Sequence, residues 1–385
     1  MDALTTPSNW QRVRLGDIAE IKRGASPRPI ENPKWFCANS NVGWVRISDI
    51  SKNSRFLYKT AQKLSKKGIE KSRFIKQNSL IMSMCATIGK PIITKIDTCI
   101  HDGFVVFENP KIDLNYLYYF LCYIEKEWLE SGQQGSQVNL NVDLIKNKEV
   151  FCPKDLNEQS AIANILSDVD HYLYSLDALI LKKESVKKAL SFELLSQRKR
   201  LKGFNQAWQR VRLGDIAEIK RGVRITKNEL DVFGKYPVVS GGVGFLGYTN
   251  NFNRYENTIT IAQYGTAGYV NFQKNKFWAN DVCFCVYPNK DVIKNIFLYY
   301  FLKVNQNYLY EISNRNATPY SISKDKILDF EILLPPLNEQ AAIANILSAL
   351  DSEIISLKNK KRQFENIKKA LNHDLMSAKI RVLKK

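Results

Sequence analysis

Two stretches of the chain carry apolar residues at the spacing of a helix. The first stretch advances in steps of four and three residues through Ile162, Leu166, Val169, Leu173, Leu176 and Ile180. The second has the same stripe, continued at seven-residue steps, through Ile343, Leu347, Leu350, Ile354, Leu357, Phe364 and Leu371. Apolar residues at this spacing form the seam of a coiled coil. The pattern therefore predicts two long helices that pack together.

Each of these stretches follows the letters LNEQ. Pro335 and Pro336 end the segment before the second copy, and Asn157 or Asn338 can cap the first helical turn. No proline or glycine lies between residues 159 and 197. A helix of about 39 residues is roughly 58 Å long at 1.5 Å per residue, which exceeds one turn of DNA at roughly 34 Å.

Short β-type runs separated by Gly, Asn and Pro fill residues 25–154 and 223–336. The runs are NSLIMSM, GKPIITKI and GFVVFE in the first block, and NTITIAQY, GYVNF and DVCFCVYP in the second. In both blocks an aromatic helical stretch follows, then a polar loop and a final strand; the stretches are LNYLYYFLCYIEKEWL and KNIFLYYFLKVNQNYL. We expect one fold with two different surfaces.

The chain also repeats itself. WQRVRLGDIAEIKRG stands unchanged at 10–24 and at 208–222, whereas LNEQSAIANILSDVD at 156–170 and LNEQAAIANILSALD at 337–351 share 12 of 15 positions. The two pairs of copies are not equally far apart, because the block between the two markers is shorter in the second half of the chain. Within the unchanged segment we expect the apolar residues to be core: Trp10, Val13, Leu15, Ile18 and Ile21.

Charge predicts how the two helices run. Residues 155–181 hold five acids and no Lys or Arg, and residues 182–202 hold eight bases against two acids; 337–357 and 358–385 repeat this polarity. Parallel helices would place like charges side by side, whereas antiparallel helices pair each acidic half with a basic half. A twofold relation between the copies gives this arrangement. We therefore predict an antiparallel pair with pseudo-twofold symmetry.

The net charge of +19 points to a polyanionic partner such as nucleic acid. Much of the excess positive charge lies on the basic ends of the two helices. These ends could equally be solvent-exposed sides of the coiled coil or a surface that contacts DNA. The composition, 44% apolar and 25% charged, is that of a soluble globular protein of two or three domains. No apolar run could span a bilayer and no secretory signal opens the chain, so we expect a cytoplasmic location without membrane contact.

Several motifs suggest catalysis but lack the context that it needs. GVGFLG at 242–247 suggests a nucleotide site but is not followed by a helix. NATPY at 316–320 suggests a methyltransferase loop but lacks the adjacent prolines. EIK at 20–22 and 218–220 suggests a nuclease motif, but these charges fit a helix or the scaffold better. Three histidines lie far apart, and the seven cysteines are too scattered for a metal site. Cys283 and Cys285 occupy alternate strand positions and are expected to be reduced core residues.

Taken in order, these motifs resemble the specificity subunit of type I restriction-modification systems. The resemblance rests on W-x-x-V-x-L-G-D-I-A-E-I-x-x-G opening each half, on LNEQ-x-AIANIL before each helix, and on the KKAL segments near the helix ends. In the blocks it rests on WVRISDIS, SLIMSMCATIGK and GFVVF, and on YPVVSGGVGFLGYTN, TITIAQYGTAGYV and FWANDVCF. It covers nearly the whole chain, twice.

The resemblance implies an α+β protein with two target recognition domains (1–154 and 203–336) and two long helices (155–202 and 337–385) in an antiparallel coiled coil. Each domain would read one half of a bipartite site in double-stranded DNA. The helices would set the spacing and dock two modification (methyltransferase) subunits, with restriction (helicase-nuclease) subunits joining for cleavage. The chain itself would have no catalytic, cofactor or metal site, because S-adenosylmethionine, ATP and Mg belong to the partners.

Side chains that suit base or phosphate contacts gather in a few segments of each block. The candidates are Lys66, Lys67, Lys71, Arg73, Gln133, Gln134, Ser136 and Gln137 in the first block, and Tyr264, Asn314, Arg315, Asn316, Thr318 and Tyr320 in the second. We expect the 133–137 and 314–316 loops to lie on the same DNA-facing side. Alternatives are a subunit of a related methyltransferase or restriction system, a stand-alone methyltransferase or nuclease, and a coiled-coil adaptor that binds only protein.

Overall fold

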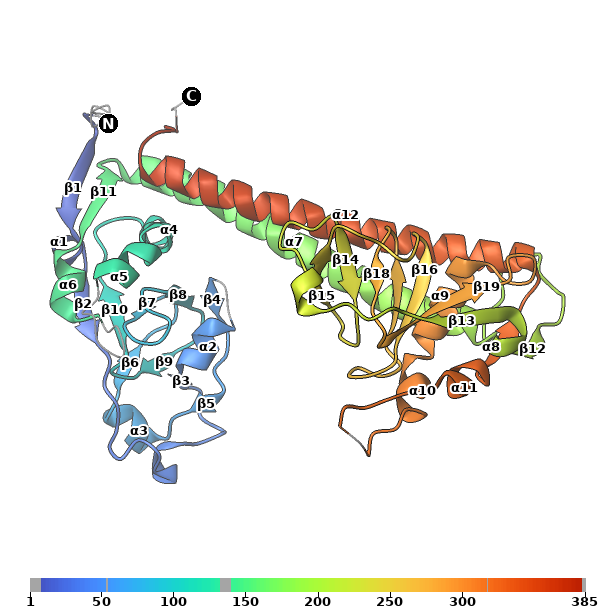
Figure 1. Ribbon diagram of the computed structural model, residues 1–385. Helices are drawn as coiled ribbons and strands as arrows, with labels where there is room; N and C mark the ends of the chain where they lie inside the picture. The colour runs from blue at the N-terminus through green and yellow to red at the C-terminus, as the bar shows by residue number, and fades with distance from the viewer. Residues whose placement is uncertain (1–7, 53–54, 132–139, 317, 383–385) are drawn as a thin grey trace. The chain divides into compact units, whose positions relative to one another are not determined.

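The computed structural model describes residues 8–52, 55–131, 140–316 and 318–382. The chain forms two compact units, Met1–Ser175 with Lys361–Lys385, and Leu176–Lys360. Each unit contains a globular domain and one end of each long helix, α7 (Leu156–Leu195) and α12 (Leu337–Met376) (Figure 1).

The globular part of the first unit mixes short strands and helices. Its strands are β1 (Trp10–Arg14), β2 (Glu20–Arg23), β3 (Gly43–Val45), β4 (Phe56–Leu57), β5 (Gln62–Lys63), β6 (Arg73–Ile75), β7 (Leu80–Ser83), β8 (Pro91–Thr94), β9 (Thr98–Ile100), β10 (Phe104–Glu108) and β11 (Glu149–Pro153). Its helices are α1 (Leu15–Ile18), α2 (Ile47–Ser51), α3 (Lys66–Glu70), α4 (Leu114–Tyr123), α5 (Glu125–Ser131) and α6 (Val142–Asn147), with a 3-10 turn at Pro33–Trp35.

The second unit has fewer elements, in a related order. Its strands are β12 (Gln209–Arg212), β13 (Ala217–Arg221), β14 (Tyr236–Val239), β15 (Phe245–Thr249), β16 (Thr258–Ala262), β17 (Val270–Gln273), β18 (Trp278–Ala279), β19 (Cys283–Pro288) and β20 (Glu331–Leu334). Its helices are α8 (Leu213–Ile216), α9 (Asn295–Val304), α10 (Gln306–Glu311) and α11 (Lys324–Leu328), with a 3-10 turn at Lys227–Glu229.

The central sheets of the two units share one order of four strands, and the first sheet has β4 as an additional edge strand. In the first, the order is β2-β10-β7-β8-β4, and in the second it is β13-β19-β16-β17. In both, the end of the repeated 15-residue segment is an edge strand that pairs antiparallel with the next strand, β2 with β10 and β13 with β19. The prediction of one fold for the two blocks is therefore confirmed.

The apolar runs of the central strands are explained by burial on both faces. On β7, Leu80 and Met82 belong to the core that contains α4, whereas Ile81 belongs to a separate core on the opposite face. Successive side chains of a strand point to opposite faces, so a sheet covered on both sides needs apolar residues throughout. On β19, Cys283 and Cys285 are buried and free, as the sequence predicted.

The long helices are antiparallel in each unit. The core of the first unit contains residues from the start of α7, such as Leu166, together with Leu375 and Met376 at the end of α12. The core of the second contains Leu195 from the end of α7 and Leu347 from the start of α12. The predicted seam residues are buried or half-buried throughout both helices. The charge argument for antiparallel packing is therefore confirmed.

Both helices end in the same way. Gln197 and Ala378, which stand at equivalent positions of the two copies, have positive φ values of 64° and 58°. Just beyond them, Lys199 N–H donates to Glu193 O, and the second copy repeats this bond from Ile380. This is the hydrogen-bond pattern of a Schellman-type helix end. The helices have equal lengths because the stop signals, like the LNEQ start signals, are copied.

Three local predictions need correction. Asn157 does not cap α7, because the cap oxygen comes from Asp155, which accepts the Asn157 N–H at 2.9 Å; Asn338 does accept a first-turn N–H, that of Glu339. Each aromatic stretch forms two helices rather than one, α4 with α5 and α9 with α10. EIK at 20–22 and 218–220 lies on edge strands rather than helices. In the described residues, no helix combines the length and apolar character that crossing a bilayer requires.

Candidate nucleic-acid interface

The repeated 15-residue segment is fixed to the start of a long helix in both units. In the first unit, the Trp10 indole N–H donates to Glu158 Oε1 at 3.1 Å. In the second, the Trp208 indole N–H donates to Glu339 Oε2 at 3.0 Å. In the first unit the apolar residues of the segment, such as Leu15, are buried in the core. Val13 is the exception and is half-buried. The other expected core positions are confirmed in the first unit, and the identical letters anchor each domain to a long helix.

The last residue of the segment must be glycine. A Cβ on Gly24 would lie 2.0 Å from the carbonyl oxygen of His101, and one on Gly222 would lie 2.1 Å from that of Asn280. No side chain fits so close to backbone, so glycine is the residue that permits this approach. The segment therefore brings the end of its edge strand against the loop before β10 or β19.

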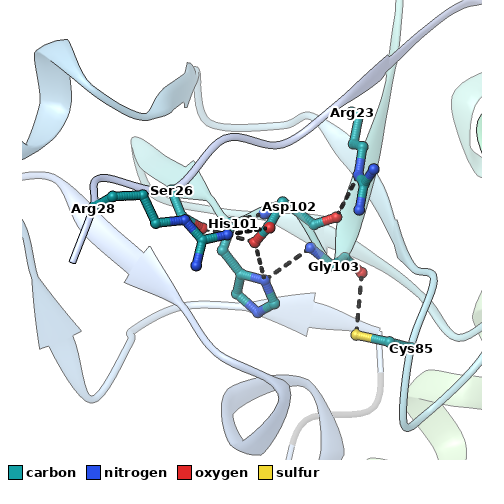
Figure 2. A network of polar contacts seen from close by, with 7 residues as sticks. All are labelled: Arg23, Ser26, Arg28, Cys85, His101, Asp102 and Gly103. Carbon is teal, nitrogen blue, oxygen red and sulfur yellow. Dashed lines mark hydrogen bonds and ion pairs between the residues drawn. The ribbon is translucent and has the colours of Figure 1, made fainter. Parts of the chain in front are cut away.

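In the first unit this contact builds a polar network around Asp102 (Figure 2). Arg23 Nε donates to the Asp102 carbonyl oxygen at 2.7 Å, and the two carboxylate oxygens accept from Ser26 Oγ at 2.8 Å and Arg28 Nη2 at 2.9 Å. Burial by itself would raise the pKa of Asp102, but the Ser26 hydrogen bond, the backbone and the charge of Arg28 hold that pKa below its ordinary value. Asp102 therefore orients two arginines, Arg23 through its backbone carbonyl and Arg28 through its charged carboxylate.

His101 supports this network without carrying charge. Its Nδ1 accepts the Gly103 N–H at 2.9 Å, and its ring packs against Phe104 with centroids 4.6 Å apart. Burial lowers the pKa of His101 to about 4, against the opposing effect of Asp102. The imidazole is neutral near pH 7 and acts as a packing and hydrogen-bonding group.

One predicted candidate joins this network directly. Arg73 Nε donates to the Arg23 carbonyl oxygen at 2.6 Å. Lys66 and Lys67 are exposed on α3, and Lys71 is exposed directly after it. We call Arg23, Ser26, Arg28, Arg73, His101 and Asp102 the first loop cluster. Gln133, Gln134, Ser136 and Gln137 lie outside the described residues, and the expectation that their loop and the 314–316 loop lie on the same DNA-facing side stays a prediction.

In the second unit the structure brings together candidates that lie far apart in sequence. Tyr264 and Asn314 both form β-bridges to Ser321. The Asn314 N–H donates to Ser321 O at 2.7 Å, and the Gly265 N–H donates to Tyr320 O at 3.1 Å. The 313–321 loop, described except for residue 317, is therefore a strand-like partner of the turn that follows β16.

Arg315 is held at the exposed rim of this assembly. Its guanidinium lies 5.3 Å from the ring centre of Tyr310 and 5.2 Å from that of Tyr320, and its Nε donates to Tyr310 O at 3.0 Å. The Asn314 side chain accepts the Asn316 N–H at 3.0 Å, which fixes the turn, and Thr318 is exposed nearby in the loop. Aromatic rings on which an arginine rests limit its freedom and orient its donors.

The two units build their loops on one turn. Ala86 and Gly89 after β7 have φ values of 60° and 77°, and Gly265 and Gly268 after β16 have 76° and 86°. The polar loop also returns to the same place. Leu140 N–H donates to Met84 O at 3.0 Å, and Ile322 N–H donates to Gln263 O at 2.9 Å.

This equivalence places Cys85 of the first unit where the second has Tyr264. The same edge of the same sheet therefore carries different side chains in the two units: the first has Cys85 and His101 where the second has Tyr264 and Asn280. The loop of the second unit adds Asn314, Arg315 and Tyr320. Unlike side chains on one frame are what two different recognition surfaces require.

Sequence reasoning missed arginines that the structure places at this edge. Arg221 Nε donates to Asp281 O, as Arg23 does to Asp102, and Arg254 Nη2 donates to Arg221 O at 2.7 Å, as Arg73 does to Arg23. We call Arg221, Arg254, Tyr264, Asn314, Arg315 and Tyr320 the second loop cluster. Arg23 and Arg221 lie inside the unchanged segment, whose interpretation as scaffold concealed them. The available signal was an Arg-Gly pair ending both copies.

The motifs set aside as non-catalytic occupy structural positions. Glu20 and Lys22 form an ion pair 2.9 Å long on β2, and GVGFLG forms a turn and the first part of β15. In the described part of the chain, no group of three or more His, Cys, Asp or Glu residues could hold a metal ion.

Comparison with known proteins decides the family. The family described as the type I restriction modification DNA specificity domain matches residues 7–183 and again residues 205–366. The chain belongs to this family. It is 23% identical over 358 residues to the type I restriction enzyme EcoprrI specificity subunit of Escherichia coli, covering 88% of this chain and 86% of the relative. It is also 24% identical, over an alignment of 424 residues, to the type I restriction enzyme MjaVIII specificity subunit of Methanocaldococcus jannaschii. That alignment covers 99% of this chain and 95% of the relative.

The fold comparison agrees. The crystal structure of a type I restriction-modification system S subunit from M. genitalium matches with a TM-score of 0.68 at 18% identity, over 97% of both chains. Membership of the specificity family assigns the chain the DNA-recognition role of a restriction-modification complex, a role that is not itself catalytic. The loop clusters, at the edges where the two copies differ, are its candidate DNA-contacting surfaces.

Proposed function

We propose that each unit reads one half of a bipartite site in double-stranded DNA through its own loop cluster. The observation that supports this most directly is the shared turn after β7 and β16, which carries unlike side chains in the two units. A protein that needed to read the same bases twice would gain nothing from this difference. Two half-sites of different sequence would require it.

The chemistry of the clusters suits this task. In the second unit, Asn314, Arg315 and Asn316 are exposed donors, and Arg and Asn are the side chains that read guanine and adenine edges in the major groove. In the first, Lys66, Lys67 and Lys71 are exposed cations beside the Arg73 strand. Such lysines suit phosphate contacts, which position a protein on the duplex without reading sequence.

The helices and the repeated segments are proposed to serve assembly. α7 and α12 would set the distance between the half-sites and dock two modification subunits. The bonds from Trp10 and Trp208 fix the repeated segments to the helix starts in the same way, so that the duplicated surfaces look alike to two copies of one partner. Restriction subunits would join for cleavage, in the cytoplasm. S-adenosylmethionine would be bound by the modification subunits, and ATP and Mg by the restriction subunits.

The test is to express the chain with its modification subunit in a host that lacks other methyltransferases and to map methylated bases across the genome. The expected result is one bipartite motif with a constant spacer, and no methylation when either subunit is omitted. Methylation by this chain alone would instead indicate a stand-alone methyltransferase. A complex that forms but does not bind DNA would indicate a protein-only adaptor.

A sharper version replaces only the two loops that carry Tyr264, Asn314, Arg315 and Tyr320. Exchanging residues 313–321 and 263–268 for the corresponding segments of another specificity subunit should change one half of the motif and leave the other half and the spacer unchanged. Changes in both halves would contradict the assignment of one half-site to each unit.

A further inference from the structure

The hairpin formed by β14 and β15 carries exposed apolar side chains at its tip. Val243, Phe245 and Leu246 are 59%, 51% and 51% exposed. Val243 lies in the turn, and Phe245 and Leu246 begin β15. The large exposed part of these three side chains contributes little to folding, and exposed apolar groups in contiguous positions mark binding sites. The tip therefore requires an explanation outside the unit's own core.

The tip is held against the second loop cluster. Gly241 O accepts from the Thr266 N–H at 2.9 Å and from Thr266 Oγ1 at 2.6 Å. A Cβ on Gly241 would lie 2.3 Å from Tyr264 O, so this glycine is needed for the close approach. The hairpin tip is thus fixed beside the turn that carries Tyr264 and pairs with the 313–321 loop.

No close contact within the chain requires glycine at the next two glycine positions, Gly242 and Gly244. A Cβ on Gly244 would meet no atom within 4 Å, and one on Gly242 would meet nothing nearer than 3.8 Å; neither residue has a positive φ. The fold would accept alanine at both positions. Their missing side chains leave room above the tip for a molecule from outside.

The surroundings of the tip are cationic. At the hairpin base, Asn280 Nδ2 donates to Ser240 Oγ at 3.2 Å, and Asn280 Oδ1 accepts the Ile225 N–H, next to the exposed Arg224. Arg221 and Arg315 complete the set. Among the described residues of the loops at 221–226, 240–246, 263–268, 280–282 and 313–321, the charged side chains are these three arginines and Asp281. Asp231 lies on the other side of the hairpin, where its N–H donates to Tyr248 O at 2.8 Å. An apolar tip flanked on one side by three arginines fits DNA, whose bases are apolar on their faces and whose backbone is anionic.

We propose that this hairpin tip is a wedge, with Phe245 inserting between adjacent base pairs of the half-site and Val243 and Leu246 packing against the sugars. Apolar side chains that enter a base step unstack it and bend the duplex. Gly242 and Gly244 let the backbone approach the DNA, and Arg221 and Arg224 hold the flanking phosphates. This inference rests on the proposed reading of DNA by the second unit, and it adds DNA deformation to that reading.

The test uses the complex of the full chain with its modification subunit. The probes are duplexes that carry the mapped site with 2-aminopurine at successive positions of one half-site, because this base fluoresces more strongly when it is unstacked. The wild-type complex is expected to raise fluorescence at one step. F245A should abolish that rise and weaken binding about tenfold or more, the scale for loss of an aromatic anchor.

The control is F233A. Phe233 is 91% exposed and precedes β14, whereas the tip follows that strand. It should behave like wild type in both measurements. G244A provides a second arm: it should melt at the wild-type temperature, because its Cβ meets nothing, yet bind the duplex more weakly.

The outcomes separate the two proposals. Site-specific binding by the wild-type complex with no fluorescence rise at any step, or an F245A variant with unchanged fluorescence and affinity, would overturn the wedge and leave the proposed function standing. F245A that fails to bind the modification subunit without DNA would assign the tip to a protein interface. A wild-type complex without site-specific binding would refute the proposed function itself.

Discussion

Lys368 on α12 and Asp170 on α7 form an ion pair 2.5 Å long inside the first unit, and Tyr119 on α4 donates to the other Asp170 oxygen at 2.6 Å. The second unit repeats this contact at the equivalent position of its own helix pair, where Asp351 binds Lys187 and accepts from Tyr300 at 2.6 Å. In each unit one carboxylate therefore joins both long helices to the aromatic helix of the globular domain.

Removing the lysine from this contact should destabilise the first unit. Asp170 is 8% exposed, so K368M leaves a buried carboxylate without its cation. Breaking a buried pair in this way costs about 3 kcal/mol. The expected result is a lower denaturant midpoint for K368M in equilibrium unfolding. K369M, which removes the same charge from an exposed neighbour, should differ little from wild type; equal midpoints for the two variants would contradict the role of the pair.

The glutamine of each LNEQ copy should be as sensitive. Gln340 is fully buried, and its amide accepts the Lys294 N–H at 2.7 Å and donates to Pro335 O at 2.8 Å. It thus joins the start of α9 to the end of β20. Q340L keeps the volume but leaves two buried backbone groups unpaired, at about 1 to 3 kcal/mol each.

The measurement for Q340L is thermal unfolding followed by circular dichroism. The same substitution at exposed Gln62 serves as the control and should leave the midpoint unchanged. Gln159 makes the matching bonds in the first unit, to the Asp113 N–H and Pro153 O, so Q159L should reproduce the loss. A neutral effect of both substitutions would show that the bonds are dispensable.

His101 should make the first unit sensitive to acid. Its pKa falls from 6.5 to about 4 on folding because the ring is buried. Between these values the unfolded chain binds a proton that the folded chain does not, so stability is present above pH 6.5 and is lost as the pH falls toward 4. The loss amounts to about 3 kcal/mol at 1.36 kcal/mol per pKa unit.

The variant for this test is H101N, because the second unit has Asn280 at the equivalent position. Unfolding midpoints measured from pH 7.5 to pH 4.5 should fall less steeply for H101N than for wild type. Identical slopes would mean that His101 is not the group responsible.

The sequence predicted the helix pair because its signals are local. The seam through Leu166 and Leu347 is a periodicity, and the antiparallel direction follows from blocks of charge that can be counted. The duplicated fold was equally accessible, because copied segments fold alike. Asn157 was misassigned as a cap since Asp155, two residues earlier, offers an equally good oxygen.

The candidate site was only partly predictable because it is assembled by tertiary contacts. Tyr264 and Asn314 are both bridged to Ser321, but no local pattern links them. Arg23 and Arg221 were missed because each residue has two roles. The backbone pairs within an edge strand of the scaffold, whereas the side chain lies at the loops that form the candidate DNA-contacting surface. The spacing of residues in the sequence does not predict which way such an arginine side chain points. Its direction depends on the position of Asp102 or Asp281 in the folded protein, because the arginine donates to the backbone oxygen of that residue.

Arg315 offers the test of base reading in one half-site. Its guanidinium is held between Tyr310 and Tyr320, so its donors are oriented before DNA arrives, and a bidentate contact to a base contributes about 1 to 3 kcal/mol of discrimination. R315A should lower methylation of the cognate site about tenfold or more and relax the preference at one position of one half. R315K keeps the charge but loses the planar fork, so it should also lose discrimination.

K66A, which removes a proposed phosphate contact, should instead weaken binding to all sequences alike. It should also lower the slope of log affinity against log salt concentration by about one. These variants are compared by methylation of duplexes altered in one half at a time. Unchanged activity and preference at both halves for R315A would remove Arg315 from the interface, because an oriented guanidinium that read a base could not be deleted without effect.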